Sequence, residues 1–379
     1  MPIDPSLLDR DMEIIRQRRG PDMIRMGNQT VPRVRIPLPF PTLMRITSGG
    51  IPVGAVTRIY GSPSGGKTQL AYWIMACAQQ FRHPRFPNGL KCCYWNVEGQ
   101  YDEAYVRSIG VDTDELVLME TDVIEDIAES LELLLASIHL HVIDSASFAT
   151  PADELAAKPG DWSARALHAR AWKRAINRIH HRMDKSSNVL IVIDHETQDM
   201  SGNTEPLSGK RMAYRSDLSI QLSRGSWLYY DQHGELVTND ELKEKSKHGY
   251  GASGVREADG SEITVRIPKS RVCRPLRTGK MRLDLHKMRF DTAFELAEHA
   301  KFMDINGQPA HRTGLPPLAP AHGTWYWLPG YTTDGRRKSN WSWDEKDVVK
   351  AHGMRGLRTA IAADERLQSF ILETMLKEG

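Results

Sequence analysis

The amino-acid sequence predicts an α/β fold in which a mostly parallel, twisted sheet is flanked by helices. Largely apolar runs of strand length, such as Leu140–Ile143 and Val189–Ile193, alternate along the chain with segments of helical periodicity. Strands that are buried on both faces read as continuous apolar runs, and parallel strands require helical crossovers. A glycine-rich turn also joins the β-branched run Ala55–Tyr60 to the Ala-rich, largely apolar run Gln69–Gln80. These observations predict a strand, a turn and a buried helix in that order.

Length and composition limit the possible classes of protein. With 379 residues, of which 40% are hydrophobic, the chain is long enough for one large core with appendages, and global disorder is excluded. The net charge of +2 means that any nucleic-acid site must come from local basic patches. Composition shifts predict three parts: residues 1–41, a core at 42–299 and a small C-terminal α+β domain at 300–379.

The cysteines and the apolar runs indicate the compartment. The four cysteines contain no C-x-x-C pair, which argues against a disulfide framework or a zinc cluster. No apolar run of about 18 residues exists, and the N-terminus lacks a signal-peptide core. We therefore expect a soluble, cytoplasmic protein that does not use a membrane.

The N-terminal part predicts a helix on a stiff strap. Asp4–Arg19 carries large apolar residues on one face, and Val31–Pro41 contains four prolines, which favour an extended linker. Such an arm would dock on another surface, although folding back on its own domain is the alternative.

The remaining elements follow from periodicity. Leu218–Leu222 and Ile263–Ile267 alternate in polarity, which predicts exposed or antiparallel strands, and Asp344–Lys377 predicts a last helical stretch. Further strands are expected at Lys91–Val97 and Leu116–Met119, and further helices at Tyr101–Ile109, Val123–Ser137 and Ala164–Met183.

The glycine-rich turn has the pattern G-x-x-x-x-G-K-T. Glycines there let successive N–H groups point at one anion, the lysine reaches phosphates, and the threonine hydroxyl suits Mg²⁺. The following helix adds its positive N-terminal end. A Gly/Ser surface loop is the alternative, but the strand and helix on either side favour binding of a nucleotide such as ATP with Mg²⁺. The candidate residues are Gly61, Ser62, Pro63, Ser64, Gly65, Gly66, Lys67, Thr68 and Gln69.

Three polar residues follow apolar strands. Asp144, Glu98 and His195 should therefore emerge at the carboxyl edge of the sheet, beside the glycine-rich loop. Asp144 could hold the Mg²⁺ shell, Glu98 could deprotonate the attacking water, and His195 could sense the γ-phosphate. The alternatives are a helix-capping aspartate, a surface-turn glutamate and a solvent-facing histidine.

Basic segments suggest contacts with nucleic acid. Residues 266–289 contain nine Lys/Arg and one acid, and residues 165–182 contain six Lys/Arg and three His but no acid. A polar, loop-like stretch at 196–215 adds further cations. Each patch alone could be a solvated face, but together they favour a grip on a DNA backbone.

With these motifs in this order, the sequence resembles the bacterial RecA recombinase family, especially its phage-encoded branch, in which a histidine can replace glutamine at position 195. The likeness is co-linear from the N-terminal helix to about Trp327. The stretches that carry it are Ser48–Thr68, Tyr94–Asp112, His141–Ser147, Asn188–Glu196 and Ile267–Pro275.

The resemblance implies roles for individual residues. Glu98 looks like the catalytic glutamate, Lys67 and Thr68 like phosphate and Mg²⁺ contacts, and Asp144 like the Mg²⁺-site aspartate with Ser145 beside it. Lys269 and Arg271 resemble a basic pair that reaches the ATP of a neighbouring subunit, and His195 resembles the γ-phosphate sensor. Asp102 and Tyr105 resemble the adenine contacts, and the two DNA-binding loops map to about 157–166 and 196–215, with Trp162, Arg165, Arg170, Gly202, Asn203, Gly209, Lys210 and Arg211 as DNA contacts.

The resemblance also implies a function. It predicts a DNA-dependent ATPase that forms filaments on single-stranded DNA, pairs it with double-stranded DNA, and works with single-strand-binding and loader proteins. A ring-forming helicase and a non-catalytic recombination mediator are the alternatives. Asp194 departs from the family's usual asparagine, and its charge would be repelled by ATP unless it is paired. The second loop is also shorter than is usual in the family.

Overall fold

The computed structural model describes residues 5–19, 33–155, 164–183, 187–198, 204–206, 210–231, 236–240, 257–302, 318–319, 321–322, 325–328 and 349–376. The chain divides into two compact units, Met1–Val34 and Arg35–Gly379. In the first unit, α1 (Pro5–Arg19) confirms the predicted N-terminal helix. Leu7 and Leu8 on α1 are exposed by 51% and 48%, respectively. Docking of this helix on another subunit stays a prediction.

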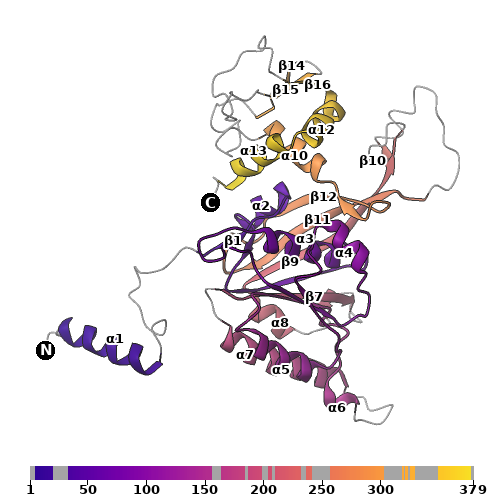
Figure 1. The fold of residues 1–379 in the computed structure, drawn as a ribbon. Coiled ribbons are helices and arrows are strands. Elements are labelled where there is room, and N and C mark those ends of the chain that lie inside the picture. Colours follow the sequence, from indigo (N-terminus) through magenta and orange to yellow (C-terminus); the bar gives the residue numbers. More distant parts are fainter. Residues whose placement is uncertain are drawn as a thin grey trace. The chain divides into compact units, whose positions relative to one another are not determined.

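The larger unit is built on one sheet with the strand order β13-β12-β11-β9-β3-β7-β6-β4-β5 (Figure 1). Neighbouring strands run parallel from β9 through β3 to β5, which confirms the mostly parallel sheet. Every residue of β4 and β6 is buried, as expected for strands covered on both faces. The bounds are β3 Ala55–Gly61, β4 Cys92–Asn96, β5 Leu116–Met119, β6 Leu140–Asp144 and β7 Val189–Gln198.

Helices cover both faces of the parallel strands. In Figure 1, α3 and α4 lie on one side of the sheet, and α5 and α7 lie on the other. Trp172 of α7 and Ile127 of α5 belong to one apolar cluster with Trp95 of β4, so that face is closed by large side chains. The helices are α3 Lys67–Gln80, α4 Glu103–Ile109, α5 Ile124–Leu134, α6 Ala152–Leu155 and α7 Ala164–Arg182.

The register of the parallel strands aligns their carboxyl ends. Gly61 at the end of β3 pairs with His195 of β7, and Asn96 at the end of β4 pairs with Asp144 of β6. Residues that follow these strands therefore meet at one edge of the sheet, as predicted.

The other half of the sheet is antiparallel from β9 to β13, and it confirms the predicted antiparallel strand at Ile263–Ile267. The prediction for Leu218–Leu222 is confirmed on one side of the strand, where these residues pair antiparallel with β11, whereas on the other side they pair in parallel with β3. Most of them are buried, so the alternation does not mark an exposed strand. Their polar residues are paired inside the fold: Ser219 Oγ lies 3.0 Å from Ser216 Oγ, and Gln221 donates to Glu196 at 3.0 Å. The bounds are β9 Leu218–Tyr230, β10 Leu236–Thr238, β11 Gly260–Ser270, β12 Thr278–Asp284 and β13 Arg289–Phe290.

The proline-rich strap is packed on the larger unit from Arg35 onward. A short β1 (Arg35–Ile36) pairs with β2 (Ile51–Pro52), and Ile36 is fully buried. Pro41 then begins α2 (Pro41–Thr47), where a proline fits because the first N–H of a helix has no intrahelical partner. The side chain of Glu295, from α10, accepts a hydrogen bond from the Thr42 N–H at 3.1 Å and so caps α2.

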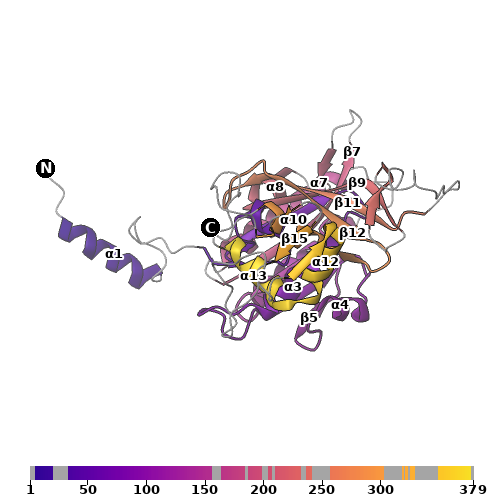
Figure 2. The ribbon, with the colours of Figure 1, turned by 90° about the horizontal axis from the view of Figure 1, so that it is seen from above.

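The C-terminal elements gather around their own core, and Figure 2 shows α10, α12 and α13 close together. Leu296 and Ala300 of α10 share this core with Leu357, Ile361 and Ile371. The predicted helix over Asp344–Lys377 was wrong at Val349–His352, which forms β16 beside the aromatic strand β15. The bounds are α10 Thr292–Phe302, β14 Ala321–His322, β15 Trp325–Leu328, β16 Val349–His352, α12 Gly353–Ala363 and α13 Glu365–Leu376. None of the helices in the described ranges combines the length and apolarity needed to cross a bilayer.

Candidate nucleotide site

The glycine-rich loop lies between β3 and α3, where the sequence places it. Gly61 has φ 141°, and a Cβ there would lie only 1.9 Å from the Leu222 carbonyl oxygen of the neighbouring strand. Gly66 has φ 80° and is the N-cap of α3, which receives no side-chain cap. The first N–H groups of this 14-residue helix therefore face the loop and can bind an anion.

Lys67 is buried inside the loop and bonds to the loop itself. Its Nζ donates to the carbonyl oxygens of Gly61 at 3.2 Å and of Ser62 at 2.9 Å. Burial lowers the pKa of Lys67, and the negative charges of Asp144 and Glu98 oppose that shift. A phosphate bound in the loop would compete with these carbonyl oxygens for the lysine protons. It would also give the lysine ammonium group a negatively charged partner.

Asp144 fits a Mg²⁺ site. It is 2% exposed, its Oδ2 accepts a hydrogen bond from the Tyr94 hydroxyl at 2.9 Å, and its Oδ1 is buried without a hydrogen-bond partner. Burial raises the pKa of Asp144 to about 6, and the Thr68 hydroxyl beside it opposes the shift. An orphaned carboxylate oxygen next to a threonine hydroxyl supplies the hard oxygen ligands that Mg²⁺ prefers, with water and phosphates completing the shell.

Glu98 and His195 contact each other at the carboxyl edge of the sheet. His195 Nε2 lies 3.0 Å from Glu98 Oε1, and the Ser145 hydroxyl donates to the same oxygen. Although burial opposes the change, the hydrogen bonds from His195 and Ser145 and the charge of Lys67 lower the pKa of Glu98. Glu98 is therefore a carboxylate at neutral pH and can accept a proton.

The predicted adenine contacts, Asp102 and Tyr105, lie at the start of α4. Asp102 is the N-cap of α4, and its Oδ1 accepts the Tyr105 N–H at 3.0 Å. The Tyr105 hydroxyl accepts from Gln69 at 2.7 Å and donates to the Met288 carbonyl at 2.8 Å. Asp102 thus fixes the start of α4, which holds Tyr105 beside α3.

Lys269 and Arg271 lie on the other side of β9 and hold the end of a short helix, α8 (Lys210–Arg215). Lys269 Nζ donates to the carbonyl oxygens of Tyr214 at 2.8 Å and of Ser216 at 3.2 Å, and Arg271 donates to Tyr214 O at 2.9 Å. Burial and the charge of Arg271 lower the pKa of Lys269. Within one chain this basic pair therefore binds the backbone at the end of the predicted second DNA loop.

That second loop contains regular structure which the sequence did not predict. β7 continues to Gln198 and pairs in an antiparallel hairpin with β8 (Thr204–Pro206), and α8 follows. Local polarity suggested an irregular loop, whereas the hairpin is an extension of a core strand. Lys210 and Arg211 begin α8, while Gly202, Asn203 and Gly209 lie outside the described residues.

Part of the predicted first loop lies on α7. Arg165 is in its first turn, Arg170 is exposed on it, and Trp162 lies outside the described residues. Lys173 and Arg174 are exposed on the same helix.

Arg58 is the partner that the sequence reading of Asp194 lacked. Its Nε donates to Asp194 Oδ2 at 3.0 Å, and both side chains are almost fully buried. Each of the two is a charged residue within a strand of the parallel sheet, but no local signal in the sequence joins them. The charge of Asp194 is thus neutralised within the fold, and the repulsion expected from an unpaired carboxylate is removed.

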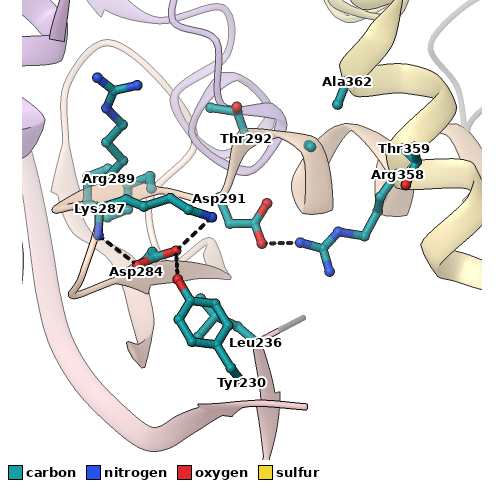
Figure 3. Close-up of a pocket in the computed structure, with 12 residues that line it drawn as sticks. Tyr230, Leu236, Asp284, Lys287, Arg289, Asp291, Thr292, Arg358, Thr359 and Ala362 are labelled. Atoms are coloured by element: carbon teal, nitrogen blue, oxygen red, sulfur yellow. Dashed lines mark hydrogen bonds and ion pairs between the residues drawn. The ribbon is translucent and has the colours of Figure 1, made fainter. Parts of the chain in front are cut away.

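A cavity of about 280 Å³ lies near the loop and is drawn in Figure 3. The Tyr230 hydroxyl donates to Asp284, Lys287 lies 3.3 Å from the same carboxylate, and Arg358 of α12 pairs with Asp291. Phe290 lines this cavity and also lies against Gly66, since a Cβ on Gly66 would be 2.9 Å from its ring. Arg358 thus joins α12 to Asp291, which follows Phe290 in the sequence, and Phe290 is the residue that lies against the phosphate loop.

A glycine-rich loop before an uncapped helix, with a lysine and two carboxylates at the sheet edge, defines a phosphate-loop nucleotide-binding protein of the α/β class. The family model of the RecA N-terminal domain matches residues 41–247, which is more than half of the chain. The chain therefore belongs to the RecA family, as the sequence motifs predicted.

Curated relatives agree with this assignment. Protein RecA of Deinococcus radiodurans is 30% identical over 262 residues, covering 68% of this chain and 64% of that protein. DNA repair protein recA homolog 3, mitochondrial, of Arabidopsis thaliana is 26% identical over 270 residues, and the match covers 68% of this chain and 55% of that protein. Protein RecA of Colwellia psychrerythraea is 26% identical over 242 residues, covering 62% and 61%. The chain thus spans less than two thirds of the length of these relatives.

Proposed function

We propose that this protein is an ATP-dependent DNA recombinase that forms filaments on single-stranded DNA and promotes homologous pairing and strand exchange. The observation that carries the proposal is the contact between His195 and Glu98 at 3.0 Å. It joins a candidate catalytic base to the strand that continues into the predicted second DNA loop. Hydrolysis and DNA contact would thus share one structural element.

In the proposed reaction Lys67 exchanges the carbonyls of Gly61 and Ser62 for phosphate oxygens, and the N-terminus of α3 holds the remaining charge. Asp144 and Thr68 would hold Mg²⁺, partly through water, and Mg²⁺ would supply positive charge beside the phosphates. Glu98 takes the proton of the attacking water. Asp102 and Tyr105 position the adenine, with the tyrosine ring against the base.

Lys269 and Arg271 are proposed to complete the site of a neighbouring subunit. Their hydrogen bonds to Tyr214 and Ser216 would be exchanged for the neighbour's phosphates, so binding of ATP would release the end of α8. Loss of the γ-phosphate would return the pair to α8 and loosen the interface. This exchange supports assembly as a helical filament, for which α1 and its strap would supply a second contact between subunits.

The DNA contacts are proposed to be sequence-tolerant and sensitive to salt, because exposed cations such as Arg170 on α7 would bind phosphates. Single-stranded and double-stranded DNA are the expected partners, with single-strand-binding and loader proteins as further ones. The histidine at position 195 supports a phage-encoded origin and action in the cytoplasm of the infected cell.

The test is the rate of ATP hydrolysis with and without single-stranded DNA, combined with electron microscopy in a slowly hydrolysed ATP analogue. We expect DNA to raise the rate and helical filaments to form. Closed rings of fixed size would favour a helicase or motor, and binding of nucleotide without any hydrolysis would favour a mediator. Either result would contradict the recombinase.

A further inference from the structure

We propose that Arg58, Asp194 and Ser147 form a hydrogen-bonded relay that positions His195 and so sets how strongly DNA accelerates hydrolysis. This inference rests on the proposed function, in which His195 and Glu98 act on the triphosphate. None of the three relay residues is expected to touch the nucleotide, so they are positioning residues.

The first part of the relay is an ion pair inside the sheet. Arg58 lies on β3 and Asp194 on β7, with Nη2 to Oδ2 at 2.9 Å and side chains exposed by 3% and 0%. The Arg58 guanidinium also lies 4.0 Å from the centre of the Tyr60 ring. Burying two charges in the central strands of a sheet costs free energy that apolar residues would not cost. The pair therefore calls for a role beyond packing, and its neighbours supply one.

The second part is the Ser147 hydroxyl. It donates to Asp194 Oδ1 at 2.7 Å and accepts the backbone N–H of His195 at 2.7 Å. A hydroxyl has one proton, and a carboxylate can only accept. With Arg58 pairing the carboxylate, the proton of Ser147 is committed to Asp194, and its lone pair faces His195. The donor and the acceptor of each hydrogen bond of Ser147 are thus fixed.

The departure from asparagine at position 194 gains a physical meaning here. An asparagine amide can donate or accept, depending on its orientation, so it would leave the direction of the Ser147 hydroxyl open. A carboxylate held by an arginine fixes it. The charged pair would then ensure that the Ser147 hydroxyl always accepts the His195 N–H, and this hydrogen bond is the anchor of His195.

The anchor lies between Glu98 and the β7–β8 hairpin, the two parts that the proposed coupling must connect. On one side of His195 its ring meets Glu98 at 3.0 Å and packs edge-on against Phe148, with ring centres 5.4 Å apart. On the other side β7 runs on into the hairpin with β8. Because the His195 backbone is held by Ser147, a movement of the hairpin would turn the His195 side chain instead of shifting the strand. Without the anchor, part of the movement would be lost before it reached Glu98.

The test compares Ser147→Ala with Ser147→Thr and with the control Ser261→Ala, which removes a serine hydroxyl that is buried on β11. We expect Ser147→Ala to lower the DNA-stimulated kcat roughly 10-fold, because small misplacements of catalytic groups are costly. The KM for ATP should stay within about two-fold, since the phosphate loop is untouched. Ser147→Thr, which keeps the hydroxyl, should restore most of the rate, and Ser261→Ala should match the wild type.

A second arm removes the ion pair. The double variant Arg58→Met with Asp194→Asn deletes both buried charges together, so neither is left uncompensated. We expect it to lose DNA stimulation to a similar extent as Ser147→Ala. Adding Ser147→Ala to it should cost little more, because the three residues act in series. Independent, additive losses would overturn the relay.

Hydrogen exchange tests the relay without any activity. The amide of His195 should exchange faster in Ser147→Ala than in the wild type or Ser261→Ala, and unchanged exchange would overturn the anchor. In the kinetic arm, a wild type that ignores single-stranded DNA contradicts the proposed function. A wild type that is stimulated, together with a Ser147→Ala variant that keeps full stimulation, overturns the relay alone.

Discussion

The two groups of cations at the proposed nucleotide site differ in burial and in the atoms that hold them. Lys67 is 5% exposed and bonded within its own loop, whereas the Arg271 side chain is 54% exposed. Lys67 therefore belongs to a half-site that one chain completes, together with Glu98 and Asp144. Lys269 and Arg271 hold a backbone carbonyl at the end of α8 and are proposed to exchange that partner for the phosphates of another subunit. In the proposed site, the first half is therefore preorganised within one chain, whereas the second half depends on assembly.

The preorganised half should fail most completely when its base is removed. Glu98→Gln keeps the shape of the side chain but cannot accept the proton of water, so we expect kcat for ATP hydrolysis to fall by roughly 10²–10⁴-fold. Binding of a fluorescent ATP analogue and of DNA should persist, because Glu98 is not a phosphate ligand. Glu103→Gln, which removes an exposed carboxylate paired with Arg107, is the matched control. Unchanged turnover in Glu98→Gln would remove Glu98 from the role of base.

Mixing variants tests whether the two halves belong to different molecules. Lys67→Ala and Lys269→Ala should each abolish hydrolysis, with losses of about 10²–10³-fold for one stabilising donor. In an equal mixture, random neighbours should rebuild roughly a quarter of the sites, because each site draws on two subunits.

The control for this mixture is Lys67→Ala with Glu98→Gln, whose defects lie in the same half, so no activity should return. Recovery in the control, or none at any ratio in the test mixture, would contradict a site shared between subunits. The measurement is the steady-state ATPase rate over a series of mixing ratios with saturating single-stranded DNA.

The raised pKa of Asp144 should appear as a pH-dependent demand for Mg²⁺. Burial raises this pKa from its ordinary value of 3.8 to about 6, so the carboxyl binds a proton below about pH 6 and is a poor ligand there. We expect the Mg²⁺ concentration for half-maximal hydrolysis to rise about tenfold for each pH unit below 6, because metal and proton compete.

Tyr94→Phe sharpens this prediction. The Tyr94 hydroxyl donates to Asp144 and lowers its pKa, so its removal should move the rise in Mg²⁺ demand to higher pH. The effect of this pKa shift on folding stability has the opposite sign to that of a paired carboxylate, whose pKa is lowered. The native state holds the proton more tightly between about pH 3.8 and 6, so the contribution of Asp144 to stability falls as the pH rises through that range. A Mg²⁺ demand that is flat down to pH 5 would remove Asp144 from the metal site.

The same division explains how much the sequence could predict. The parallel half can be predicted because its strands are largely apolar runs and the residues of its motif are contiguous. The strands, the phosphate loop and the edge residues therefore follow from local patterns. In β9 the alternation of Leu218–Leu222 predicted the antiparallel pairing with β11 but neither the parallel pairing with β3 nor the burial of most of these residues, because its serine and glutamine find polar partners outside the strand. Periodicity encodes which face is buried but not which polar groups meet there.

Long-range pairs mark the limit of that reading. Arg58 and Asp194 are 136 positions apart, and no local signal joins them. The cap that Glu295 places on α2 spans 253 positions. The strand at Val349–His352 likewise depends on pairing with β15, so a helix was the better local prediction. Each of these features is fixed by tertiary contact.

The smallest expected effect concerns an exposed cation that the proposal assigns to DNA. Arg170 on α7 should contact one phosphate, so Arg170→Ala should lower the slope of log Kd against log salt by about 0.7 for single-stranded DNA. Arg178→Ala is the matched control, since it removes the same charge from the same helix but from a side chain that pairs with Glu132.

Binding is measured by fluorescence anisotropy at several salt concentrations, with mixed-sequence and homopolymer DNA. Arg170→Ala should weaken both DNAs equally, because a phosphate contact carries no sequence information. An unchanged slope, or an equal change in Arg178→Ala, would take Arg170 off the DNA path and leave α7 as a solvated face.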